Sequence, residues 1–137
     1  DRQPVAVTTL DACIREFGRP AFIKIDVEGY EAEVLAGLSE PVPAVSFEFT
    51  PELMETARTC IDRLDWLGGG RARFQVALGE SMVFALPDWV SADAVKAALA
   101  ALPAKAMGDV YARLPTAAAG DSGPGFSEAR RDRPGAV

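Results

Sequence analysis

The sequence predicts an α/β fold with a mostly parallel sheet that ends in an antiparallel hairpin. One observation is the alternation of three strand patterns with three helix patterns between residues 5 and 67. Such an alternation implies parallel strands joined by right-handed crossovers. A second observation is Gly79-Glu80, a two-residue connection between short apolar runs that is typical of a tight hairpin. The length of 137 residues, 49% of them hydrophobic, suits one domain with one core.

The first half of the chain supplies the parallel strands. Its predicted elements are a strand over 5–9, a helix over 10–17, a strand over 21–27, a helix over 28–38, a strand over 44–49 and a helix from 51. Thr9 or Asp11 can cap the first helix, and Gly18 ends it. Few polar residues interrupt 21–27, so we expect that strand to be buried on both faces.

The second half of the chain contains the hairpin. Its predicted elements are strands over 73–78 and 81–86, a helix over 91–102 capped by Ser91, and a short last strand over 109–113. Gly68-Gly69-Gly70 separates this half from the preceding helix. We expect residues 1–114 to form the domain. Residues 115–137, where Ala, Gly, Pro and Ser dominate, are expected to form a disordered tail.

Composition excludes several classes of function. The net charge is −6 and no basic face is evident, so we expect no binding to nucleic acid. No apolar run is long enough to cross a membrane. Histidine is absent, which excludes catalytic triads built on it. Cys13 and Cys60 show neither metal-ligand spacing nor a disulfide framework, so a reduced, cytoplasmic setting is expected.

Two acidic residues mark the junction between the strand over 21–27 and the helix that follows it. Asp26 and Glu28 are two positions apart, so they would point into one crevice if the strand continued through both. Ligands bind at this end of a parallel strand. The pair could hold a divalent metal at Asp26, orient a substrate hydroxyl or act as a general base. In the alternative interpretation, Glu28 caps the helix and Asp26 binds backbone N–H groups.

Four neighbouring residues complete the candidate site. Lys24 shares the face of Asp26 and either forms an ion pair with it or lies exposed at a sheet edge. Glu48 ends the next strand and either enters the same crevice or caps the following helix. Gly29 and Tyr30 are candidate substrate-binding residues beside it. For Gly29, a backbone requirement is favoured over a phosphate-binding loop, because no second glycine follows at the required spacing.

These residues carry a resemblance to a known family. Thr8-Thr9-Leu10-Asp11, together with Lys-Ile-Asp-Val-Glu-Gly over 24–29 and Val-Leu-Ala-Gly over 34–37, resembles the signature of the FkbM-type methyltransferases. The resemblance covers residues 5–113 and is strongest over 8–48. It implies a Rossmann-like fold in which the strands ending at Asp26 and Glu48 are the fourth and fifth. It also implies methyl transfer from S-adenosylmethionine to an oxygen of a small molecule or sugar. Asp26 and Glu28 would orient the acceptor or act as base, supported by Lys24 and Glu48.

The resemblance lacks one part of the family pattern. A glycine-rich turn after a first strand and a ribose-binding acid after a second are absent from the sequence. We therefore expect a C-terminal portion of the domain, which alone binds S-adenosylmethionine weakly or not at all. One alternative is a non-enzymatic module that self-associates through an exposed sheet edge. Another is a magnesium-dependent phosphoryl-transfer site at Asp26 and Glu28.

Overall fold

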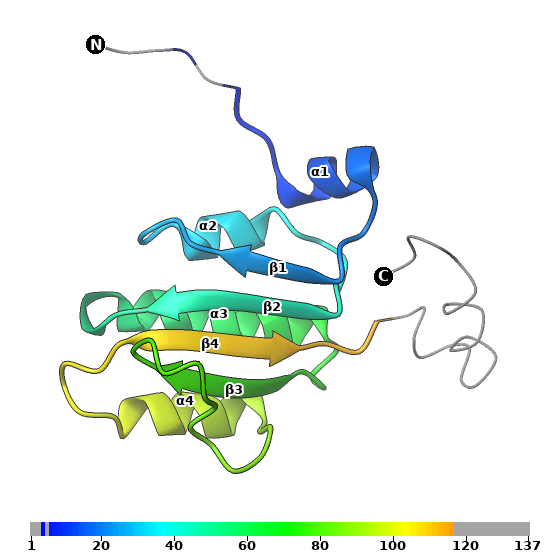
Figure 1. Ribbon diagram of the computed structural model, residues 1–137. Coiled ribbons are helices and arrows are strands. Elements are labelled where there is room, and N and C mark those ends of the chain that lie inside the picture. The colour runs from blue at the N-terminus through cyan, green and yellow to red at the C-terminus, as the bar shows by residue number, and fades with distance from the viewer. Residues whose placement is uncertain (1–3, 5, 117–137) are drawn as a thin grey trace.

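The computed structural model describes residues 4 and 6–116, which form one sheet with helices behind it (Figure 1). The elements are α1 (Leu10–Phe17), β1 (Phe22–Ile25), α2 (Glu31–Ala36), β2 (Ala44–Phe49), the 3-10 helix η1 (Pro51–Leu53), α3 (Met54–Leu67), β3 (Arg73–Leu78), α4 (Ala92–Ala100) and β4 (Gly108–Arg113). The tail predicted over 115–137 lies outside the described residues apart from Pro115 and Thr116, and Thr116 is 3% exposed.

The sheet is mixed, not mostly parallel as predicted. Its strand order is β1-β2-β4-β3. β1 and β2 are parallel, whereas β4 runs antiparallel to both β2 and β3. The last strand, predicted over 109–113, is found as β4 and lies in the interior of the sheet (Figure 1). This arrangement follows because the chain crosses behind the sheet through α4 before it returns as β4.

The hairpin predicted at Gly79-Glu80 is wrong in its second strand. Residues 81–86 form no strand and reach β3 through an isolated bridge between Ala77 and Phe84 and a 2.7 Å hydrogen bond from Ala85 N to Val76 O. The buried Gln75 side chain explains the difference. Its Nε2 donates to the carbonyl oxygens of Leu86 and Asp88 at 2.8 and 3.0 Å, and its Oε1 accepts from Leu86 N at 3.2 Å. Backbone groups that a second strand would pair with β3 are thus bonded to a side chain.

The two faces of the sheet differ because strand side chains alternate. The face toward α3 and α4 carries buried apolar residues, which include Ile25, Val45, Phe47, Phe49, Phe74, Val76, Val110 and Ala112. The opposite face carries the alternate, polar positions, which include Lys24, Ser46, Glu48, Gln75, Asp109 and Tyr111. Apolar burial therefore fixes which side chains point away from the helices.

The N-terminal region departs from prediction in two strands. The helix α1 is as predicted, with Thr9 Oγ1 accepting from Ala12 N at 3.1 Å. The described residues of the strand predicted over 5–9 are not in the sheet, and Val7 is 90% exposed. The strand predicted over 21–27 shortens to β1 and is not buried on both faces, since Phe22 is 47% exposed. β1 is exposed because it is an edge strand of the described sheet.

The helix predicted over 28–38 begins three residues later, at Glu31. Glu28 and Gly29 have φ angles of 49° and 111°, which a right-handed helix excludes. Farther along, α3 ends before Gly68 as expected, and Ser91 caps α4 by accepting from Ala94 N at 3.2 Å. The helix predicted from residue 51 begins as η1 and continues as α3.

Candidate functional site

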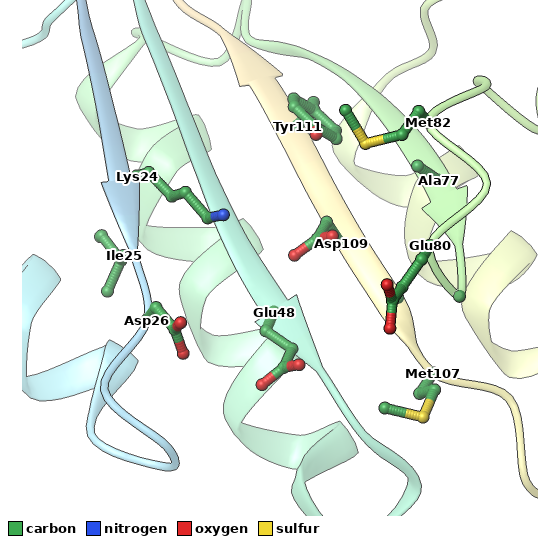
Figure 2. Close-up of a pocket in the computed structure, with 12 residues that line it drawn as sticks. Lys24, Ile25, Asp26, Glu48, Ala77, Glu80, Met82, Met107, Asp109 and Tyr111 are labelled. Carbon is green, nitrogen blue, oxygen red and sulfur yellow. The ribbon is translucent and has the colours of Figure 1, made fainter.

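A cavity of about 710 Å³ lies on the polar face of the sheet, where β1 and β2 end and β4 begins. It is lined by Lys24, Ile25, Asp26, Glu48, Ala77, Gly79, Glu80, Met82, Met107, Gly108, Asp109 and Tyr111. Figure 2 shows Asp26, Glu48 and Asp109 presented side by side by neighbouring strands. Three of the predicted site residues, Lys24, Asp26 and Glu48, are therefore brought together.

The carboxylates of the cavity influence one another. Glu48 and Asp109 are directly opposite across β2 and β4. Burial raises the pKa of Glu48, and the charges of Asp26 and Asp109 raise it further. Burial also raises the pKa of Asp109, which Lys24 lowers and Asp26 raises. A carboxylate with a raised pKa is a stronger base than an ordinary one, which suits proton abstraction.

Lys24 supplies the positive charge of the cavity. It lies exposed on the edge strand, and no ion pair joins it to Asp26 within the described part of the chain. Its ammonium group instead extends across β2 toward Asp109 (Figure 2). The effect of Lys24 on the pKa of Asp109 agrees with this direction. Of the two interpretations of Lys24, the exposed edge lysine is the one found.

Glu28, Gly29 and Tyr30 do not line the cavity. The predicted shared direction of Asp26 and Glu28 is wrong, because β1 ends at Ile25 and the chain enters a turn. Glu28 adopts a left-handed conformation there, and its charge contributes only the smallest of the effects that raise the pKa of Glu48. Tyr30 is 66% exposed. Gly29 meets a backbone requirement, since its φ of 111° is strained for any other residue.

Sequence reasoning missed the residue that holds this turn together. Glu31 is 2% exposed, and its carboxylate accepts from Gly29 N at 3.0 Å and from Val27 N at 3.4 Å. The alternative in which Glu28 caps the helix is not found, because no side chain caps α2, and Glu31 instead binds the backbone of the turn before it. From the sequence, the position of Glu31 near the start of the helix predicts only a favourable interaction between its charge and the helix dipole. The bonds of Glu31 fix the segment that directly follows Asp26.

The far wall of the cavity was also missed. It consists of Glu80, Met82, Met107, Asp109 and Tyr111. From the sequence, Glu80 belongs to a predicted turn and Asp109 starts a predicted strand, and neither position indicates a binding site. The alternation of Asp109 and Tyr111 on one strand was the available signal, since both face the same side. It could not be used without knowing that β4 pairs with β2.

No group of three or more His, Cys, Asp or Glu side chains within the described residues could hold a metal ion, and the metal at Asp26 stays a prediction.

Cys13 and Cys60 are free cysteines. No helix in the described ranges is long and apolar enough to cross a membrane.

Comparison with known proteins assigns the first part of the chain to a family. Residues 1–75 match the family described as the methyltransferase FkbM domain. The matched region includes β1, α2, β2 and α3 and ends within β3. It contains Lys24, Asp26 and Glu48. No curated protein and no solved structure matches the chain. Because the match covers more than half of the sequence and includes one wall of the cavity, the chain belongs to the FkbM methyltransferase domain family.

Proposed function

We propose that this chain forms the acceptor side of an S-adenosylmethionine-dependent O-methyltransferase, which acts on a hydroxyl of a small molecule or sugar. The supporting observation is the cavity at the ends of β1 and β2 in a chain of this family. Carboxylates accept hydrogen bonds from hydroxyl groups, and Lys24 can donate to an acceptor oxygen. The location agrees with the general rule for ligands in open α/β sheets.

The described residues fit the acceptor better than the cofactor. Folds of this class hold the cofactor with a glycine-rich turn after a first strand and a ribose-binding acid after a second, and the sequence shows neither. The cavity residues therefore support the acceptor side and not a complete cofactor site. The bound cofactor would supply the electrophilic methyl group.

The roles of the residues follow from their positions. Asp26 would orient the acceptor hydroxyl, because it lies directly after β1 in a turn held by Glu31. Glu48 or Asp109 would take the hydroxyl proton, since each has a raised pKa. Lys24 would keep Asp109 ionised and ready to accept. Orientation of this kind supplies a large part of the rate increase in transfer reactions.

The test compares Asp26→Asn with Asp93→Asn in the complete protein that contains this domain. Asp93 is an exposed aspartate in α4 that does not line the cavity. With radioactive S-adenosylmethionine and a panel of sugars and other hydroxyl compounds, we expect Asp26→Asn to lower methyl transfer on the order of 10²-fold, the cost of a misplaced acceptor. The melting temperatures of the two variants should agree. Near-normal transfer by Asp26→Asn would refute the role.

Cofactor binding is tested separately. Calorimetric titration of the 137-residue chain with S-adenosylmethionine should give weak heat or none. Tight binding would contradict the view that the chain supplies only the acceptor side.

A second candidate function is an interaction module. β1 pairs only with β2 among the described strands, and Phe22 in β1 and Val27 just beyond its end are exposed. An open strand edge can pair with a second copy of the chain. Light scattering across a concentration series tests this function. Dimer formation that Phe22→Lys reduces would support it, and a monomer at all concentrations would exclude it.

A further inference from the structure

A second cavity, of about 420 Å³, lies at the other end of the polar face, where β3 begins and β4 ends. Its lining includes three arginines and an indole, from Arg71, Arg73, Arg113 and Trp89. We infer that this cavity binds a small molecule that carries a phosphate or diphosphate group. The inference is independent of the proposed methyltransferase function.

The pairing of the strands places like charges together. Arg73 and Arg113 are directly opposite across β3 and β4. Like charges in this position destabilise a sheet. No ion pair to Arg71, Arg73 or Arg113 is found among the described residues, although the chain has 20 acidic residues against 14 basic ones. An anion in the cavity would neutralise this charge.

The aromatic wall holds one guanidinium in place. Arg113 lies over the ring of Trp89, with 4.9 Å between the guanidinium carbon and the ring centroid. Phe84 packs edge-on against Trp89 at 5.3 Å and against Tyr111 at 5.3 Å. Paired hydrogen bonds between Phe74 and Val90 anchor the segment next to Trp89. The wall is therefore arranged before a ligand arrives, which lowers the entropic cost of binding.

The chemistry of the wall selects the ligand class. A guanidinium presents two parallel N–H donors that match phosphate oxygens, and three of them balance the charge of a phosphate or diphosphate. The net charge of −6 opposes association with polyanions such as nucleic acid, so a small anion is favoured. Arg113 and Asp109 are four residues apart on β4, which is about 13 Å at the rise of a strand. The arginine cavity is thus separate from the acidic one.

The experiment titrates the full chain with pyrophosphate and inorganic phosphate. The sequence contains two tryptophans, so a Trp66→Phe background leaves Trp89 as the single fluorescent indole. Trp66 belongs to α3 and does not line the cavity. We expect a saturable change in Trp89 fluorescence that weakens as salt rises.

Three variants locate the binding. Arg73→Lys keeps the charge but loses the paired donors, and Arg113→Gln loses both. We expect affinity to fall on the order of 10- to 100-fold with Arg113→Gln and by a smaller factor with Arg73→Lys. Arg15→Gln removes an exposed arginine of α1 and should leave affinity unchanged. Because Arg113 also packs on Trp89, the melting temperature of each variant is measured. If Arg113→Gln does not fold, the affinity of Arg73→Lys for pyrophosphate tests the inference by itself.

Several results would overturn the inference. One is the absence of saturable binding to either phosphate probe. Another is equal weakening by Arg15→Gln, which would indicate a general charge effect. Malonate bound as tightly as pyrophosphate would indicate a carboxylate site. A single-stranded oligonucleotide bound more tightly than pyrophosphate would indicate a polyanion surface.

Discussion

Replacing Glu31 by glutamine removes one of the two hydrogen bonds that hold the turn after β1. The amide keeps one oxygen acceptor, but its NH₂ group would face a backbone N–H that in the parent donates to the carboxylate. Loss of a bond to a charged acceptor costs about 1.5–3 kcal/mol, and burial of one less charge offsets part of it. We expect the free energy of unfolding to fall by about 1–3 kcal/mol, a large share of a typical 5–15 kcal/mol.

Urea unfolding followed by circular dichroism measures this loss. For a small domain with a slope of about 2 kcal/mol per molar urea, a loss of 2 kcal/mol moves the midpoint by about 1 M. The slope itself should not change, because the same surface is exposed on unfolding. Hydrogen exchange at the Gly29 amide should accelerate in the variant, since that amide donates the shorter of the two bonds to Glu31.

Glu33→Gln is the matched control. Glu33 is in the same helix turn but is exposed, so its replacement removes the same charge without the bonds to the turn. We expect its unfolding free energy to stay within about 0.5 kcal/mol of the parent. If Glu31→Gln behaves like this control, or if Gly29 exchange is unchanged, Glu31 does not hold the turn that places Asp26.

Three further predictions test the site and the core. Gly108→Ala would press its Cβ into the carbonyl of Ala77 between β4 and β3, so the melting temperature should fall with a loss of about 3 kcal/mol or more; an unchanged melting temperature would contradict the close strand packing. Burial raises the pKa of Asp109 above its unfolded value, so the native state gains stability as pH falls through the folded pKa. Asp109→Asn should therefore be more stable than the parent at neutral pH, and the difference in unfolding free energy should shrink toward pH 3.8. Urea unfolding at neutral pH and at pH 3.8 measures this difference, and a difference that does not change with pH would contradict the burial of Asp109. Burial raises the pKa of Cys60 to about 12, so native alkylation should modify Cys13 and spare Cys60 until urea is added; mass spectrometry that finds Cys60 modified first would refute this.

Local signals predicted the elements that depend on neighbouring residues. The cap at Thr9, the stop at Gly68 and the cap at Ser91 are each found where the sequence placed them. The bounds of β2 and β3 also agree with prediction. In each case the physical cause is a hydrogen bond or a backbone preference within a few residues of the element's end.

The elements that depend on distant residues could not be predicted in this way. The place of β4 between β2 and β3 depends on pairing across the chain, and so does the contribution of Asp109 to the cavity. The buried amide of Gln75 replaced a strand that the turn at Gly79-Glu80 had suggested. The prediction that Asp26 and Glu28 point in the same direction was wrong because it requires the strand to continue through both residues. The backbone of Glu28 instead adopts a left-handed conformation.

The strand pairing gives the strongest reason to regard both cavities as binding sites. Glu48 lies directly opposite Asp109, and Arg73 lies directly opposite Arg113. Each like-charge pair costs stability, whereas one acidic and one basic residue at either position would gain it. Both pairs lie on the polar face, where the core places no constraint on charge. A sheet under selection for stability alone would pair opposite charges there, so the acidic end and the basic end agree with the two proposed sites, one for a hydroxyl acceptor and one for a phosphate group.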